Sequence, residues 1–180
     1  AINRIVDRFG ATIKEYSPRR EEVLSEETAY LVTDLLQSVV DNGTGGSARW
    51  KYKFTHPAGG KTGTTQNWTD AWFVGFSPKI AAGVWFGVDD PKVSLGVNQS
   101  GSRAALPVWA KFMKAAHDSM GWKPEKFIKP DGVSTQKICR ISKLLPIRNC
   151  PVENEIFITK YSPSQKCKVH TDGSSRRDRN

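Results

Sequence analysis

The sequence has 180 residues, of which 38% are hydrophobic and 25% charged, enough for one globular domain with an appended segment. No apolar run approaches the roughly 18 residues that span a bilayer, which excludes a membrane-spanning helix within these residues. The net charge of +9 is uneven, because residues 1–121 carry 14 Lys and Arg against 12 Asp and Glu, whereas residues 122–180 carry 13 against 6. The basic last third favours either anionic partners or a solvated tail without a partner.

The first elements in chain order are a hairpin and a helix. Two short strand-like runs, residues 2–8 and 11–16, flank Phe9-Gly10 and predict a hairpin. Ser25 is a good N-cap, and the two glutamates after it place negative charge at the positive end of a helix dipole. Apolar residues then recur at helical spacing as far as Val40, so one face of this helix should be buried: Ala29, Val32, Leu35, Leu36, Val39 and Val40.

Basic and aromatic residues alternate from Arg49 to Phe54. One interpretation is a nucleic-acid surface on which bases stack. The other is a strand or loop whose three rings share one buried side, because side chains alternate with period two in a strand. The surrounding residues are almost neutral in charge, so we favour the second interpretation and predict no nucleic-acid partner.

Three strand-like runs follow, at residues 61–65, 70–76 and 80–88. The short link Ser77-Pro78-Lys79 makes the last two antiparallel neighbours. Both faces of the second run are apolar, which predicts that helices cover the sheet on each side. We therefore expect an α+β fold with an antiparallel sheet between helices.

A second helix is predicted from Ala104 to Met120, with Gly121 at its end and an apolar stripe at Val108, Trp109, Phe112, Met113 and Ala116. Beyond Trp122, short Lys-rich and Pro-containing pieces replace this periodicity. We expect three segments: a sheet-containing part over residues 1–121, a basic, irregular extension containing the cysteines over 122–170, and a disordered tail over 171–180.

All three cysteines lie in the extension, at Cys139, Cys150 and Cys167, and His170 follows the last of them. Zinc sites usually contain close C-x2–4-C pairs, and here only the final Cys-x2-His pair is close. A disulfide with one cysteine left over is favoured if the protein is exported. We predict no metal and no cofactor, and the pairing of the cysteines stays open.

One short motif carries chemistry, Lys61-Thr62-Gly63-Thr64-Thr65. A phosphate-binding P-loop would need a glycine at position 55, which is Thr, and a helix afterwards. An edge strand lining a cleft fits better. Its backbone can offer an N–H to an oxyanion, its lysine supplies positive potential, and its threonines supply hydrogen bonds. Lys-Thr-Gly is also the third element of the Ser-x-x-Lys, Ser-x-Asn, Lys-Thr-Gly set of serine acyl-transferases.

The residues around this motif resemble class A penicillin-binding proteins. The resemblance is most specific from residue 57 to residue 90, through Pro57-Ala58-Gly59-Gly60-Lys61-Thr62-Gly63-Thr64-Thr65 and Thr69-Asp70-Ala71-Trp72-Phe73-Val74-Gly75-Phe76-Ser77-Pro78. Asn42-Gly43-Thr44-Gly45 upstream and Leu106-Pro107-Val108-Trp109 downstream are similar too. A weaker similarity continues to His170, as in an extension found in some members.

The resemblance implies a bifunctional cell-wall synthase whose C-terminal domain cross-links D-Ala-D-Ala stem peptides through a serine acyl-enzyme. It implies that the backbone N–H of Thr64 completes the oxyanion hole and that the Thr62 and Thr64 hydroxyls bind the terminal carboxylate of a stem peptide or β-lactam. Lys61 would set the potential, Gly63 would leave room for the acyl group, and Thr65 would complete the substrate-binding strand.

The sequence departs from the family at the nucleophile. No Ser-x-x-Lys or Ser-x-Asn precedes Lys61, and Ser134-Thr135-Gln136-Lys137 comes after the motif without a helix pattern. We expect the nucleophile in a segment outside this chain, so that the chain alone is inactive and associates with the N-terminal part of the same protein. The resemblance also implies a location at the outer face of the bacterial cytoplasmic membrane, with the anchor outside this chain.

Two other functions stay open. A non-catalytic basic module could hold a cell-wall polyanion or a nucleic acid through the last third of the chain. A β-lactamase or carboxypeptidase would share the Lys-Thr-Gly motif, but such proteins usually lack the continuation from Asp70 to Gly75 and the extension.

Overall fold

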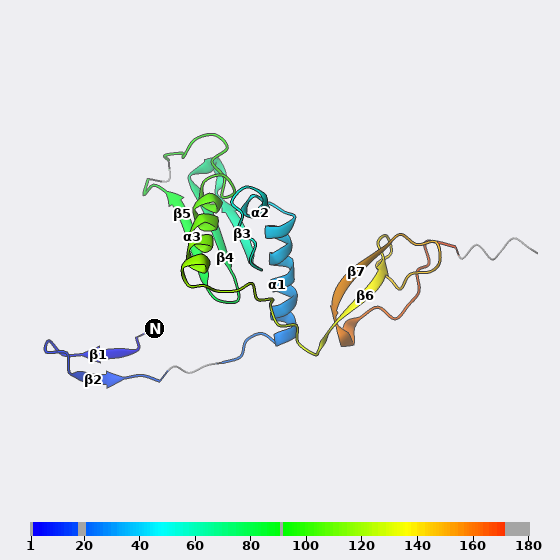
Figure 1. Cartoon of the computed structure of the whole chain (residues 1–180), viewed down its shortest axis with the longest axis horizontal. Coiled ribbons are helices and arrows are strands. Elements are labelled where there is room, and N and C mark those ends of the chain that lie inside the picture. Colours follow the sequence, from blue (N-terminus) through cyan, green and yellow to red (C-terminus); the bar gives the residue numbers. More distant parts are fainter. Residues whose placement is uncertain (1, 18–20, 91, 172–180) are drawn as a thin grey trace, which may run out of the picture.

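The structure is a computed structural model that describes residues 2–17, 21–90 and 92–171. Its helices separate three groups of strands along the chain (Figure 1). Their bounds are β1 Arg4–Val6, β2 Thr12–Glu15, α1 Glu26–Asp41, α2 Ser47–Trp50, β3 Gly59–Thr64, β4 Asp70–Phe76, β5 Ala81–Gly87, α3 Ala105–Ser119, β6 Val133–Cys139 and β7 Val152–Ile158, with 3-10 turns η1 Gln66–Trp68 and η2 Thr159–Tyr161. The predicted tail, residues 171–180, lies outside the described residues except for Thr171.

A three-stranded antiparallel sheet in the order β3-β4-β5 forms the centre of the molecule. Its register pairs Gly59 with Phe76 on one side of β4 and Phe76 with Ala81 on the other. The turn between β4 and β5 closes when the N–H of Ser77 donates to the Ile80 carbonyl at 2.8 Å. The three predicted strands are confirmed, with β3 at an open edge.

Helix α3 covers one face of the sheet. Trp109, fully buried, packs against Phe73 with the ring centroids 4.8 Å apart, and its indole N–H donates to the carbonyls of Gly75 and Ala82. A side-chain carbon at Gly75 would lie 2.6 Å from the Trp109 ring, so only glycine permits this approach. The buried stripe of α3 differs from the prediction, because Val108 and Phe112 are about half exposed while Leu106, Ala110 and His117 are buried.

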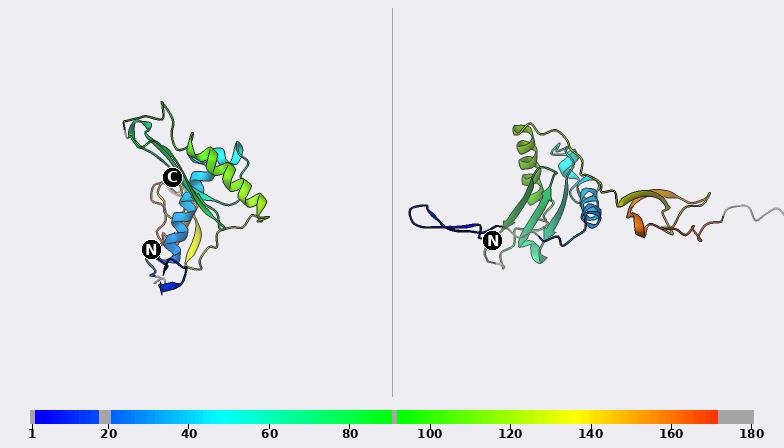
Figure 2. Two further views of the ribbon diagram at one scale, coloured as in Figure 1. Left: turned by 90° about the vertical axis from the view of Figure 1, so that its left-hand side faces the viewer. Right: turned by 90° about the horizontal axis from the view of Figure 1, so that it is seen from below.

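Helix α1 lies on the opposite face, and the two helices flank the sheet (Figures 1 and 2). A side-chain carbon at Gly59 would meet Leu36 of α1 and the ring of Phe76, each at 3.1 Å. The expected arrangement of helices on both faces is therefore confirmed. Coverage on the α1 side is incomplete, because Trp72, Val74 and Trp85 are 44%, 52% and 45% exposed.

Helix α1 begins as predicted, with the Ser25 hydroxyl accepting the N–H of Thr28 at 3.3 Å. Its predicted buried face is only partly buried. Val40 is inaccessible, but Val32 and Leu35 are 46% and 67% exposed.

The alternating basic and aromatic run forms helix α2 and a turn, so the prediction of a strand or loop whose three rings share one buried side is corrected. Phe54 is buried in the core, whereas Trp50 is 68% exposed. Arg49 points inward and donates from Nη1 to the carbonyls of Phe54 and His56 at 2.8 and 2.6 Å. The basic residue of the run thus satisfies backbone groups inside the protein.

The predicted hairpin is confirmed as β1 paired with β2, with Gly10 in its turn at φ 85°. It extends away from the sheet in Figure 1. Its apolar residues, including Phe9 at 79% and Ile13 at 67%, remain exposed.

The extension contains a two-stranded antiparallel sheet, β6 with β7, that contacts α1 beside its N-terminal end (Figure 1). The expected irregular extension is therefore corrected: residues 122–171, which we call the C-terminal module, include two seven-residue strands. Polar residues occupy much of both strands and obscured them in the sequence. The boundary at 121 and 122 stays a prediction. Among the described residues, no helix has the length and apolar character to traverse a bilayer.

Candidate active-site strand

The backbone of β3 offers hydrogen-bonding groups along the open edge of the sheet. The N–H of Thr65, just after the strand, donates to the Asp70 carbonyl at 3.2 Å, toward β4. Because backbone groups alternate sides along an antiparallel strand, the N–H groups of Thr62 and Thr64 point away from β4. The edge therefore presents the Thr64 N–H as an outward-facing backbone donor, the kind of group that can stabilise an oxyanion.

Lys61 is exposed on this strand and pairs with Val74. Its Nζ donates to the Thr62 carbonyl at 2.9 Å, which keeps the ammonium beside the open edge. Gly63 pairs with Trp72 and, having no side chain, leaves space above β3 at this position. Lys61 therefore places a positive charge beside the open edge.

The hydroxyl of Thr62 is held by a residue outside the motif. Its Oγ1 lies 3.2 Å from the Oγ1 of Thr44, which lies in the turn between α1 and α2. Either hydroxyl can donate in this pair, so one O–H remains available to an acceptor at the edge. This hydrogen bond connects the turn between α1 and α2 to β3.

The hydroxyl of Thr64 accepts the backbone N–H of Gly101 at 3.1 Å. Gly101 lies over the Gly63–Trp72 pair, where an added side-chain carbon would come within 2.2 Å of the Trp72 carbonyl oxygen. With one acceptor position occupied by a backbone donor, the Thr64 O–H can itself donate to an anion.

Thr65 lies in the tight turn that leaves β3, and its hydroxyl is engaged there. It accepts the Asp70 N–H at 2.8 Å and donates to the Asp70 carboxylate at 3.3 Å. The indole N–H of Trp85 donates to the same carboxylate at 2.8 Å and, with the threonine hydroxyls, lowers the pKa of Asp70 from its ordinary value of 3.8. Thr65 therefore supports the turn, while Lys61, Thr62 and Thr64 lie together at the edge.

Ser134 and Lys137 cannot form a nucleophile and base pair. Both lie in β6, and residues three apart in a strand point to opposite faces, whereas the Ser-x-x-Lys arrangement needs them on one helical face. The Ser134 hydroxyl instead lies 3.3 Å from that of Ser162.

Sequence reasoning missed three residues that shape the edge: Thr44, Gly101 and Asp70. Thr44 and Gly101 contact the strand across separations of 18 and 37 residues, for which the sequence carries no local signal. Asp70 does have a local sequence signal, because Asp and Thr side chains next to a turn commonly form hydrogen bonds with nearby backbone groups.

Residues able to hold a metal lie in the C-terminal module. Cys139, Cys150, Cys167 and His170 offer ligand atoms that all lie within 4.8 Å of one another. All three cysteines are free thiols.

A helix-flanked antiparallel sheet with a Lys-Thr-Gly edge strand defines the class of fold that penicillin-binding transpeptidases share with serine β-lactamases. Residues 2–114 match the family described as "Penicillin binding protein transpeptidase domain", and residues 129–172 match "Penicillin-binding protein 1A, C-terminal domain". Because the first match covers more than half of the sequence, this chain belongs to the penicillin-binding protein transpeptidase family. The resemblance to class A penicillin-binding proteins is confirmed.

Similar proteins carry the same description. Penicillin-binding protein 1A of Aquifex aeolicus is 48% identical over 113 residues, covering 63% of this chain and 15% of that protein. The Clostridium tetani protein of the same name is 35% identical over 173 residues, covering 93% of this chain and 22% of that protein. The chain thus spans less than a quarter of the length of either relative.

The fold is also found in a solved structure, penicillin-binding protein 1A from Haemophilus influenzae. It matches with a TM-score of 0.72 at 24% identity, covering 92% of this chain and 30% of that chain. At this identity the likeness shows the fold alone. It includes the C-terminal module, since the match extends over nearly the whole sequence.

Proposed function

We propose that this chain supplies the substrate-binding wall of a D,D-transpeptidase site that cross-links peptidoglycan stem peptides and is acylated by β-lactams. The observation that carries the proposal is the open edge of β3, where the Thr64 N–H, the Thr62 hydroxyl and the Lys61 ammonium occupy one short strand. An extended D-Ala-D-Ala end can lie along such an edge as an added strand.

Each group has a separate role in the proposed reaction. The Thr64 N–H stabilises the oxyanion that develops when a serine attacks the penultimate D-Ala carbonyl. The hydroxyls of Thr62 and Thr64 bind the terminal carboxylate, and Lys61 supplies the positive potential that attracts it. Gly63 leaves space for the acyl group. Thr65 belongs to this machinery as a positioning residue, through the turn that it shares with Asp70.

The serine nucleophile and its lysine base belong, in this proposal, to another segment of the same protein. The exposed apolar residues on the α1 side of the sheet, Trp72, Val74 and Trp85, form a surface suited to that segment. Relatives are more than four times as long as this chain, which leaves ample length for such a segment. We place the working protein at the outer face of the cytoplasmic membrane, where stem peptides are cross-linked.

A fluorescent penicillin tests this proposal. The chain alone should remain unlabelled, whereas the chain together with the segment that carries Ser-x-x-Lys should form a covalent adduct on that serine. In the complete assembly, Lys61→Ala should slow acylation by about 100-fold or more, as expected when an electrostatic site loses the positive charge that holds the substrate carboxylate at the edge. Lys111→Ala, which removes an exposed lysine on α3, is the matched control and should leave the rate unchanged.

Two results would contradict the proposal. Labelling of the chain alone at Ser134 would show a nucleophile that the strand geometry excludes. An acylation rate in Lys61→Ala equal to that of Lys111→Ala would show that β3 does not line the site.

A further inference from the structure

The C-terminal module brings together four side chains with the chemistry of a metal site. The Nδ1 of His170 lies 3.3 Å from the sulfur of Cys167, 3.4 Å from that of Cys150 and 3.6 Å from that of Cys139. The sulfurs of Cys139 and Cys167 are 3.7 Å apart. One ring nitrogen is therefore almost equidistant from three thiols.

These distances match the edges of a tetrahedron around zinc. With Zn–S bonds of about 2.3 Å and a Zn–N bond of about 2.0–2.1 Å, a regular tetrahedron has S···S edges of about 3.8 Å and S···N edges of about 3.6 Å. The four separations given above lie within about 0.3 Å of these edges. We propose that Cys139, Cys150, Cys167 and His170, through its Nδ1, form a closed structural zinc site.

Zinc fits this donor set better than other metals. Three thiolates and one imidazole are ligands for zinc, and four protein ligands leave no open position for a substrate or water. Three thiolates and a neutral imidazole around Zn²⁺ give a net charge of −1. Basic residues adjoin the ligands in the chain and offset that charge, namely Arg140, Lys166 and Lys168.

Backbone groups are already directed at the sulfurs. The N–H of Ile147 donates to the Cys150 sulfur at 3.3 Å, and the N–H of Val169 donates to the Cys167 sulfur at 3.4 Å. Such bonds orient and stabilise thiolate ligands in metal sites. They come from the loops that carry the ligands, so the sulfurs are positioned by their own segments.

The module needs a stabilising element of this kind. Its buried apolar residues are only Val133, Ile138, Cys139 and Cys167, two of which are the proposed ligands. Domains of about 50 residues with so small a core usually depend on disulfides or a metal. Large apolar side chains elsewhere in the module stay exposed, including Ile128, Ile141, Tyr161 and Val169.

The proposed ligands come from three separate segments. Cys139 ends β6, Cys150 lies just before β7, and the Cys167–His170 pair follows η2. The last segment is joined to the rest by a short parallel bridge, in which Leu145 bonds to Gln165 and Cys167. A metal bound to all four would fasten this segment to both strands.

A disulfide is the competing arrangement. It requires a sulfur separation near 2.0 Å and joins two cysteines, leaving the third thiol and the imidazole unused. Here the Cys139 and Cys167 sulfurs are 3.7 Å apart, and all three thiols surround the imidazole nitrogen. The gathering of four ligands, rather than two, favours the metal.

The test is metal content and cobalt spectroscopy of the 180-residue chain, purified under reducing conditions and equilibrated with Zn²⁺ or Co²⁺. We expect one zinc per chain and, with Co²⁺, the visible bands of tetrahedral cobalt together with thiolate-to-cobalt charge transfer. After denaturation and removal of the metal, three thiols should titrate. The variants C139S, C150S, C167S and H170A should each weaken zinc binding by more than about 100-fold, beyond the effect of changing a residue that only supports a ligand.

Thr171→Ala is the matched control, because Thr171 adjoins a proposed ligand but offers no sulfur or imidazole, and it should keep one zinc per chain. Absence of bound metal would overturn the proposal. This holds both if one thiol titrates, as expected for a disulfide, and if all three thiols titrate. Zinc affinity and a cobalt spectrum unchanged in H170A would equally overturn the four-ligand site. These readouts do not involve penicillin, so they are independent of the transpeptidase proposal.

Discussion

The sheet and the C-terminal module bury very different amounts of apolar surface. One cluster of ten buried residues, Trp109 among them, joins the sheet to the helices around it, whereas the module buries Val133 and Ile138 besides two cysteines. Burial of apolar side chains is the main favourable term in folding. The two regions should therefore depend on different interactions, hydrophobic packing in the first and ligand bonds in the second.

The largest expected effect that separates the regions is Trp109→Ala. The indole packs on Phe73 and, edge to face, on Phe54, and its N–H satisfies two backbone carbonyls. Its removal should lower the free energy of unfolding of the sheet region by about 3–5 kcal/mol, measured by urea denaturation. Trp50→Ala, at an exposed indole, should change it by less than about 0.5 kcal/mol.

The same variant sharpens the comparison when its metal content is measured. If the module is held by zinc, Trp109→Ala should still bind one zinc per chain, because the buried cluster around Trp109 includes no residue of the module. Loss of metal in Trp109→Ala would contradict the independence of the two regions.

A smaller effect is expected where Arg49 connects α1 to the segment leading into β3. Its guanidinium pairs with Asp41 at 2.7 Å and donates to the carbonyls of Phe54 and His56. Arg49→Ala leaves those carbonyls without their donor and should cost about 2 kcal/mol. Hydrogen exchange should show faster opening of residues 59–64.

Arg103→Ala is the control for this change, because Arg103 is an exposed arginine before α3. It should leave exchange in β3 unaltered. Equal protection of β3 from hydrogen exchange in the two variants would show that Arg49 does not stabilise the segment that leads into β3.

The sequence predicted the sheet better than the module for a physical reason. Strands β4 and β5 are apolar on both faces, α1 begins at the capping Ser25, α3 is followed by Gly121, and both helices have helical periodicity, so local patterns identify them. Strand β6 mixes polar residues on both faces, and α2 is a single turn, so neither leaves a clear pattern. The depth of burial along α1 also depends on neighbours that local sequence does not specify.

The same reasoning explains which site residues were predicted. The Lys-Thr-Gly strand is one continuous segment, so its own order of residues reveals it. Its partners Thr44 and Gly101, like the four proposed zinc ligands, come from distant segments and meet only in the folded chain. The wide spacing of the cysteines along the chain led to the prediction of no metal, because sequence spacing does not show which loops lie together in the fold.

The stability of the sheet region should depend on pH through the carboxyl group of Asp70. Hydrogen bonds from Trp85 and the threonines lower the pKa of this carboxyl below 3.8 in the folded state. The unfolded chain therefore binds its proton more readily, so Asp70 stabilises the fold above pH 3.8, and this contribution disappears as the pH falls through the lower folded value. Asp70→Asn should reduce the thermal midpoint at pH 7 and flatten its decline on acidification.

Asp118→Asn, which changes an exposed carboxylate paired with Lys114 on α3, is the control for Asp70. It should retain the steeper acid dependence of the unmodified chain. If Asp70→Asn and Asp118→Asn showed the same curve, the Trp85 bond would not stabilise the turn after β3.

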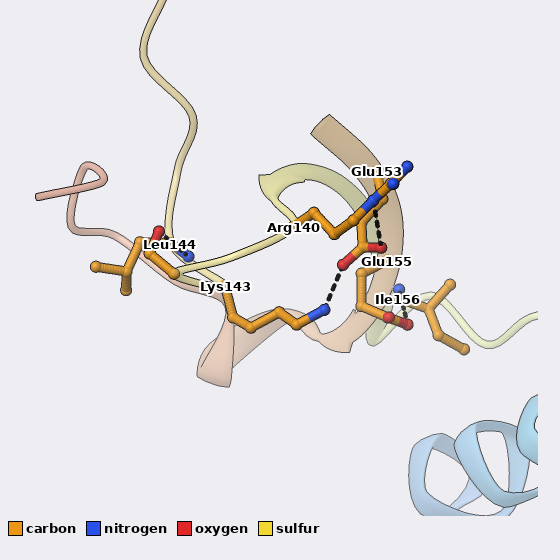
Figure 3. Close-up of polar contacts among 7 residues, drawn as sticks. Arg140, Lys143, Leu144, Glu153, Glu155 and Ile156 are labelled. Atoms are coloured by element: carbon orange, nitrogen blue, oxygen red, sulfur yellow. Dashed lines mark hydrogen bonds and ion pairs between the residues drawn. The ribbon is translucent and has the colours of Figure 1, made fainter. Parts of the chain in front are cut away.

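The smallest expected effect is in the module, at Glu153. This β7 carboxylate lies 2.5 Å from the Lys143 ammonium and 3.8 Å from Arg140, across the turn that follows Cys139 (Figure 3). Ion pairs this close to solvent contribute at most about 1 kcal/mol and weaken with salt. Glu153→Gln should therefore lower the module's unfolding midpoint only slightly, and less at high ionic strength.

Glu155→Gln provides the comparison, because the Glu155 carboxylate accepts the N–H of Ile156, its neighbour in β7 (Figure 3). If zinc bonds hold the module, removing the metal with a chelator should destabilise it far more than either substitution. If Glu153→Gln lowered the module's unfolding midpoint as much as chelation does, the module's stability would come from its surface charges instead. The contrast between a packed region and a ligand-held region would then no longer hold.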